Sequence, residues 1–503
     1  MAVHLCGLPA PGLLRTAIAA ACLALASAVA CAEPQESPDV SAVISHALAP
    51  SPLAEDLRRL TDEIGGRVSG TPAMSRAVDW GVRAFQGAGL EVHTESYQLP
   101  VSWQEESSHL TLRGPVQFPV TMVSVAWAPS TPAGGISAPL VDVGDGTEAD
   151  FAAAPVRNAI VLVHGNVLIT WADLAEEYSR APAIIERAIS GGARAILWIG
   201  SRDHRLLYRH TDAVAGELAR IPMGILARED GLRLARTLVA YPAREQAQLS
   251  INNRIGGPVT EQNVVAEIRG SERPDEFVIL GAHLDSWELG TGALDNGCNA
   301  AMVIAAARAI RAAGVHPRRT LRFILFSGEE QGLLGSWAYV RQHQAELDRV
   351  SAMITYDSGI GRVTGYSLGG RADLQAGITQ VLAPLAAWDV NTHTVDASTG
   401  TDNLDFLLEG VPNLVANQDE GNYMPNYHAA SDTLDKVDMR VLQLHVAIAA
   451  VTAYGIAQRE AVLGPRLTRP QIEALMKTSG LEGQLKTLGY WPSWESGERG
   501  RRP

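Results

Sequence analysis

The sequence has few cysteines, and most of them lie near its amino terminus. Of the four cysteines in 503 residues, Cys6, Cys22 and Cys31 fall within the first 32 residues, so only Cys298 is expected inside the folded protein. A single thiol excludes a disulfide framework, even in an oxidising compartment. Because free cysteines are usually buried, we expect Cys298 to be a packed side chain at the start of a helix and not a metal ligand.

Positive charge is also scarce. The chain carries 41 lysines and arginines against 55 aspartates and glutamates, a formal charge of −14. This balance repels phosphate backbones and makes nucleic acid an unexpected partner. A hydrophobic fraction of 46% with 19% charged residues is typical of a globular protein and excludes a disordered one. A chain of this length predicts two domains, or one large domain with an insertion.

Long hydrophobic runs are confined to the amino terminus. Arg15 precedes an apolar stretch from Thr16 to Ala30, which is short for a membrane span and is followed by small residues. We therefore predict a signal peptide over residues 1–32, cut after Ala30 or Ala32, and export to the periplasm or the medium. Cys31 could instead be a lipidated first residue, although Ala28 stands where such sites usually have leucine. No later segment is expected to span a membrane.

The residue composition and the predicted secondary structure of the chain change twice after the signal peptide. From about Phe118 to Pro258, short β-rich runs alternate with proline and glycine, without clustered acids or histidines. We expect residues 116–258 to be a domain inserted between residues 33–115 and 259–475, which form the other domain. His164 in the insert is expected to be a packed or solvated histidine. Residues 476–503 form a C-terminal extension, whose last residues, SWESGERGRRP, we expect to be a frayed tail.

After Pro258 the chain alternates regularly between strands and helices. Strands are predicted within 276–285, 320–330 and 351–359, and helices within 299–314 and 332–343. This alternation is typical of an α/β layered fold. Continuous apolar runs such as FVIL and FILF predict strands that are covered on both faces.

Potential metal ligands stand where these three strands end. The strands lead to His283 and Asp285, to Glu329 and Glu330, and to Asp357. Because the carboxyl ends of strands in an open α/β sheet gather at one edge, these side chains should converge. Asp295, after a glycine-rich loop, and His428, in a later loop, extend the set.

Buried carboxylates need compensating cations. Two histidines with four or five acids suit zinc, usually as a pair of ions that share one carboxylate. The alternative is that each acid caps a helix or decorates a loop. That interpretation is reasonable for any single residue, but not for three consecutive strand ends together with Asp295 and His428.

The motifs also resemble a known family when they are taken in order. H-x-D-S-W, G-x-G-A-x-D-N, E-E-Q-G, Y-D-S-G, G-T-D with G-V-P, and Y-H-x-x-S-D-T resemble those of the co-catalytic di-zinc exopeptidases, most closely carboxypeptidase Q and the related PA-domain aminopeptidases. The likeness runs from about residue 45 to 455. It implies a mixed, mostly parallel sheet with helices on both faces. The insert is similar to a protease-associated (PA) domain, although the three runs that carry this likeness are less specific than the motifs above. They are IVLV, AIIERAISGGARAI and IPMGILARED.

The resemblance also implies residue roles. One zinc ion would be held by His283, Asp295 and Asp357, and the other by Asp295, Glu330 and His428, with Asp295 as the bridge. Glu329 would be the general base, and Asp285 would accept a hydrogen bond from the far nitrogen of His283. The Asp295–Asn296 peptide would be cis. The run NGCN after the bridge departs from the acid or glycine-rich run common in the family, which puts only local packing in doubt.

The implied activity is hydrolysis of dipeptides or short peptides with a free amino terminus by a zinc-activated water. A general aminopeptidase of the same family, a metal-free receptor homologue and a one-zinc acyltransferase that cyclises amino-terminal glutamine are the alternatives, and zinc content per chain separates the last two from a di-zinc enzyme. Tyr423 and Tyr427 lie near His428 and could hold an oxyanion, but a packing role explains them equally well. A homodimer is left open.

Overall fold

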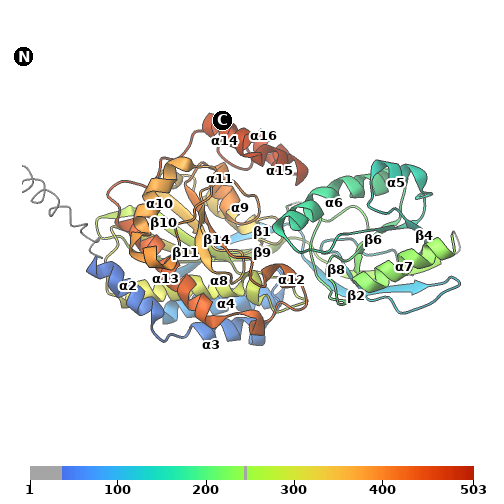
Figure 1. Ribbon diagram of the computed structural model, residues 1–503, viewed down its shortest axis with the longest axis horizontal. Coiled ribbons are helices and arrows are strands. Elements are labelled where there is room, and N and C mark those ends of the chain that lie inside the picture. Colours follow the sequence, from blue (N-terminus) through green and yellow to red (C-terminus); the bar gives the residue numbers. More distant parts are fainter. Residues whose placement is uncertain (1–36, 214, 243–245, 503) are drawn as a thin grey trace, which may run out of the picture. The chain divides into compact units, whose positions relative to one another are not determined.

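The computed structural model describes residues 37–213, 215–242 and 246–502 (Figure 1). Residues 39–503 make up one compact unit. The predicted signal peptide, including Cys31, lies outside the described residues.

The first sheet is mixed and has seven strands in the order β1-β9-β11-β10-β12-β14-β13. Neighbouring strands are parallel from β11 to β14 and antiparallel at both edges. The strands are β1 (Glu91–Leu99), β9 (Val259–Ile268), β10 (Arg273–His283), β11 (Arg319–Phe326), β12 (Val350–Thr355), β13 (Val363–Ser367) and β14 (Asn413–Gln418). The predicted α/β class and mixed, mainly parallel sheet are confirmed.

Helices cover both faces of this sheet because side chains alternate along its strands. Val278 and Leu280 of β10 pack with one set of helices, whereas Ile279 packs on the other face with Phe406. The first set comprises α2 (Pro38–Leu48), α3 (Leu53–Arg58), α4 (Pro72–Gly87), α8 (Cys298–Ala312), α10 (Gln375–Val381) and α13 (Met439–Gln458). The second comprises α9 (Leu334–Gln342) and α11 (Asn403–Leu408).

Helix α13 corrects one expectation from the sequence. By length and composition it is apolar enough to cross a membrane, contrary to the prediction that no later segment would be. Its most apolar window is 72% buried within the fold, where it packs against α8 and the central strands. A helix that is buried on most of its sides is hydrophobic on most of its sides, which explains the composition.

A second seven-stranded sheet has the order β2-β8-β4-β5-β6-β7-β3. Its strands are β2 (Trp103–Leu112), β3 (Met122–Ser124), β4 (Ile136–Asp142), β5 (Ile160–Val163), β6 (Ala195–Ile199), β7 (Met223–Leu226) and β8 (Gln246–Ile255). Helix α7 (Arg228–Ala240) packs on one face, and α6 (Trp171–Gly191) packs on the other together with the short α5 (Glu148–Ala153) (Figure 1). Its first strand begins before residue 116, the expected start of the insert.

Helix α6 begins at Trp171, well before the run AIIERAISGGARAI that the sequence singled out. A capping box between Thr170 and Asp173 starts the helix, and Pro182 lies inside it.

The expectation of a frayed C-terminal tail is wrong. Three helices follow α13: α14 (Arg469–Ser479), α15 (Leu481–Thr487) and α16 (Trp491–Ser496). Trp494 and Arg499 are 2% and 1% exposed, and Trp494 packs with Leu404 and Leu408 of α11. The tail is polar in composition, but the buried side chains of Trp494 and Arg499 attach it to the rest of the fold.

Candidate metal centre

Polar side chains at or just after the ends of three parallel strands lie at one edge of the first sheet. Strand β10 ends at His283, which lies beside Phe326, the last residue of β11. On the other side β10 pairs with β12, which ends two residues before Asp357. The predicted convergence of these strand ends is present in the structure.

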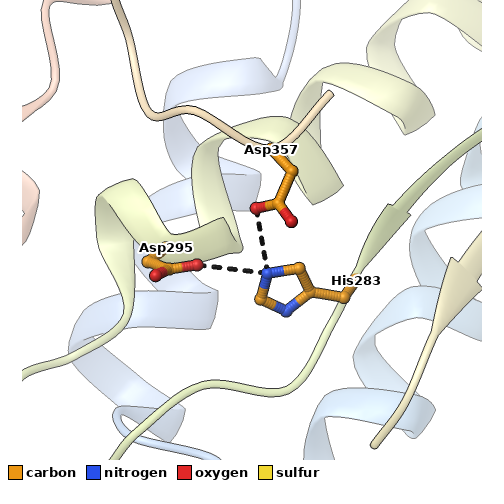
Figure 2. A group of neighbouring side chains, drawn as sticks. All are labelled: His283, Asp295 and Asp357. Atoms are coloured by element: carbon orange, nitrogen blue, oxygen red, sulfur yellow. Dashed lines mark hydrogen bonds and ion pairs between the residues drawn. The ribbon is translucent and has the colours of Figure 1, made fainter. Parts of the chain in front are cut away.

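One group of donors surrounds the imidazole of His283. Its Nε2 atom lies 3.1 Å from Asp295 Oδ1 and 3.1 Å from Asp357 Oδ1. Figure 2 shows the ring at the end of its strand, with one nitrogen directed at both carboxylates. All three side chains are buried or nearly so, and their donor atoms lie within 4.8 Å of one another.

A second group shares Asp295 with the first. Nε2 of His428 lies 3.0 Å from Glu330 Oε2 and 3.3 Å from Asp295 Oδ2. The two oxygens of Asp295 therefore face different groups, Oδ1 toward His283 and Oδ2 toward His428. A carboxylate in this position can bridge two cations.

The charges at this edge fit metal ions. Burial raises the pKa of Glu330, the nearby His428 opposes this rise and Asp295 adds to it, so that the pKa lies at about 7. Burial lowers the pKa of His428, but Glu330 and Asp295 raise it more, to about 9. In the described part of the chain, Glu330 Oε1 is buried without a hydrogen-bond partner. Crowded carboxylates next to imidazoles are the oxygen and nitrogen donors that zinc accepts, and cations would stabilise their charged forms.

Asp285 differs from the predicted arrangement. The acceptor near Nδ1 of His283 is the main-chain carbonyl of Asp285, at 3.0 Å, whereas its carboxylate lies 3.7 Å away. That carboxylate instead accepts hydrogen bonds from the amides of Glu329 and Glu330, at 3.2 and 3.3 Å. A strand-end aspartate can reach either group, and only the path of the following turn decides between them.

Glu329 lies next to Glu330 but belongs to neither donor group among the described residues. Its side chain is partly exposed. Although water reaches the residue in part, loss of solvation raises the pKa of Glu329 well above its usual value; His283 opposes this rise, and Asp357 and Glu330 add to it. The two glutamates therefore occupy different environments although they are adjacent.

Three residues outside the predicted site hold Asp295 and the loop before it in place. Asp432 accepts hydrogen bonds from the amides of Leu294 and Asp295, at 2.6 and 3.1 Å. Tyr423 donates from its hydroxyl to Asp295 Oδ2 at 3.1 Å. The buried Arg67 donates to the carbonyl of Gly292 at 2.8 Å. Asp432 and Tyr423 stand in or near the quoted motifs, whereas nothing in its own loop pointed to Arg67.

Two other expectations can be compared with the structure. The Asp295–Asn296 peptide is cis, as the resemblance implies. Cys298 is buried at the start of α8, with its thiol near the carbonyl of Leu294, and belongs to neither donor group. It is the packed thiol that the sequence predicted.

Aromatic residues line the second donor group. The ring of Tyr427 stacks on His428 at 3.7 Å, and its hydroxyl lies 3.1 Å from that of Tyr178 in α6. Trp171, at the start of α6, lies 5.8 Å from the ring of Tyr423. Helix α6 from the second-sheet region therefore contributes to the surroundings of the centre without providing a donor to it.

Comparisons with known proteins find relatives among the peptidases. The model of Peptidase family M28 matches residues 263–453. Carboxypeptidase Q of Mus musculus is 28% identical over 418 residues, which cover 81% of this chain and 86% of that protein.

Two solved structures resemble the chain. A peptidase M28 precursor from Shewanella amazonensis SB2B has 27% identity and a TM-score of 0.76, over 85% of this chain and 98% of that one. A zinc aminopeptidase from Bacillus subtilis, BSAP, shares the fold at 20% identity and a TM-score of 0.64, with the same coverage of both chains.

Proposed function

Because residues 263–453 match the model of Peptidase family M28, we propose that the protein is a di-zinc exopeptidase of this family that hydrolyses dipeptides or short peptides with a free amino terminus. One observation carries this proposal: the two oxygens of Asp295 are divided between two groups of donors, each completed by a histidine and a second carboxylate. A general aminopeptidase of the same family is the second candidate. The similarity to carboxypeptidase Q favours the first.

We assign one zinc ion to His283, Asp295 and Asp357, and the other to Asp295, Glu330 and His428. BSAP, which shares the fold, is described as a zinc enzyme. When bound, a pair of zinc ions polarises the substrate carbonyl and lowers the pKa of water toward about 7.

Glu329 is assigned to proton transfer. It is adjacent to a ligand but outside both donor groups, and it is partly exposed, so that water can reach its carboxylate. It takes a proton from the attacking water and delivers that proton to the leaving amine. Asp285 fixes the turn by accepting hydrogen bonds from the amides of both glutamates. This hydrogen bonding supports separate roles for the two side chains.

We further propose that the second-sheet region is a separate, PA-like domain that shapes access to the site and supplies no zinc ligand. The contacts of Tyr178 with Tyr427 and of Trp171 with Tyr423 support this role. The sheet begins at Trp103 and ends at Ile255, so the proposed domain starts somewhat earlier than the boundary at residue 116 that was predicted from the sequence.

Export is proposed from residues 1–32 alone. Intact-mass analysis of protein from the native host should find a chain that begins near residues 31–33. A chain that retains Met1 would contradict export, and an added lipid mass on Cys31 would identify an anchored form.

The central experiment is a panel of dipeptides and aminoacyl reporters, assayed with zinc-loaded protein that lacks residues 1–32, beside a measurement of zinc per chain. We expect about two zinc ions and hydrolysis that requires a free amino terminus. About one ion with cyclisation of amino-terminal glutamine would identify the acyltransferase. A metal-free, inactive chain would identify a receptor homologue.

A further inference from the structure

The C-terminal extension reaches the turn that carries the two glutamates. Arg499, three residues after α16, donates from Nη2 to the carbonyl of Gly332 at 3.3 Å. The same guanidinium makes a bidentate ion pair with Asp405 at 2.8 and 2.9 Å. Both side chains are almost completely buried. A bidentate pair with a buried carboxylate fixes the plane of the guanidinium as well as its position.

Aromatic rings hold the guanidinium from its sides. Its central carbon lies 4.7 Å from the ring of Tyr490 and 5.0 Å from the ring of Trp337. Tyr490 belongs to the C-terminal extension, and Trp337 lies in α9, directly after the turn. Arg499 thus connects the extension with the start of α9.

The turn itself is short and closed by its own hydrogen bonds. The amides of Gly332 and Leu333 both donate to the carbonyl of Glu329 at 2.9 Å. Gly332 has a φ of 109°, which residues with a side chain rarely adopt. A displacement of Gly332 is therefore passed directly to the backbone of Glu329.

The turn is held at both of its ends in sequence. Asp285 accepts from the amides of Glu329 and Glu330 at its start, and Arg499 donates to the carbonyl of Gly332 near its end. The first anchor comes from the same sheet edge, and the second from a segment more than 160 residues away in sequence.

We propose that Arg499 is a positioning residue for the peptidase reaction, acting through Gly332 on the placement of Glu329. This inference rests on the proposed function for its catalytic consequence, but its structural part is independent of it. A general base must lie within hydrogen-bond reach of the proton that it takes, so a shift of the turn by a fraction of an ångström lowers the rate.

The test compares two conservative variants of buried arginines. Arg499→Lys keeps the positive charge but cannot bind Asp405 in bidentate fashion and Gly332 together. The matched control is Arg319→Lys at the amino end of β11, where Arg319 is equally buried and donates to Glu276 Oε2 at 2.6 Å. Both variants lose a buried guanidinium, but only one of them touches the turn.

We expect Arg499→Lys to lower kcat by about tenfold to a hundredfold with KM changed by less than about threefold, while zinc content stays at the wild-type value. Amide hydrogen exchange at Gly332 and Leu333 should become faster in this variant and stay unchanged in Arg319→Lys. Arg499→Ala should regain part of its kcat with added millimolar guanidinium ion.

Equal kcat and equal exchange in the two lysine variants would overturn the proposal, because Arg499 would then stabilise only the C-terminal helices. If the wild-type protein hydrolyses no peptide, the proposed function fails. The exchange measurement would still decide whether Arg499 holds the turn.

Discussion

The two sheets of this protein are built alike, yet only one of them carries a candidate metal centre. Each has seven strands, a parallel centre and antiparallel edges. The second sheet also gathers polar side chains at its strand ends, where His164 Nε2 lies 3.1 Å from Asp142 Oδ2. That pair is partly exposed and has no third donor among the described residues, whereas the candidate centre on the first sheet is buried and brings together five residues that could bind metal.

The difference shows what topology contributes and what it does not. Parallel strands bring loop residues together in either sheet. A metal site also requires at least three donors around each ion and burial that makes unpaired carboxylates costly. The pairing of His164 with Asp142 raises the pKa of the histidine, as expected for an ordinary surface ion pair.

The sharpest test of the first sheet's site contrasts its two adjacent glutamates. Glu329→Gln should keep both zinc ions, the fold and substrate binding, but lose about 10²–10⁴ in kcat, or about 3–5 kcal/mol of barrier, because proton transfer is lost. Glu330→Gln should lose zinc along with activity. Zinc stoichiometry measured beside kcat and KM decides the assignment. Loss of zinc in the Glu329 variant alone would reverse the two roles.

Removal of zinc should change the pH dependence of stability. Burial raises the pKa of Glu330 to about 7 in the metal-free fold, so its protonated form is favoured there more than in the unfolded chain. The metal-free protein should therefore lose stability as the pH rises from about 4.5 to about 7, by a few kcal/mol at most. The zinc-loaded protein should gain stability over the same range, because zinc binds deprotonated ligands.

Urea unfolding of chelated and loaded protein at both pH values measures this contrast. Parallel curves for the two forms would show that the crowded carboxylates are not compensated by a metal. The second sheet serves as an internal reference, since its His164–Asp142 pair should respond to pH equally in both forms.

Trp171 tests whether the second-sheet region shapes access. The side chain is 43% exposed and lies beside Tyr423, whose hydroxyl contacts Asp295. Trp171→Ala should raise KM for substrates with apolar side chains by about three- to tenfold, with kcat and zinc content unchanged, because contact area is lost without loss of the reacting groups. Trp491→Ala, in the C-terminal helices, is the control. A fall in kcat instead of a rise in KM would assign Trp171 to the chemistry.

The smallest effect is expected at His164. His164→Ala should leave zinc content and kcat at wild-type values and reduce the free energy of unfolding by less than about 1 kcal/mol, because partly exposed ion pairs contribute little. Elemental analysis and thermal unfolding provide the measurement. Loss of zinc in this variant would remove the distinction between the two sheets.

Local sequence patterns determined much of the first sheet and its site. Apolar runs bounded by glycine and proline predict the buried strands β10, β11 and β12 and the helices between them. These signals are local, because each depends on only a few neighbouring residues. The candidate ligands could be proposed because each stands directly after such a strand or within a distinctive motif.

Contacts between distant segments decided the rest. The division of the two Asp295 oxygens, the attachment of Asp285 to the glutamate amides and the support from Arg67 and Arg499 join residues that lie 12 to 225 positions apart. No local pattern records such contacts, because side chains of the same type can bond to several partners. The packing of the sheet, the loops and the C-terminal helices determines which of those partners lies within reach. Each buried charged group then needs a hydrogen-bond or ion-pair partner among the groups around it.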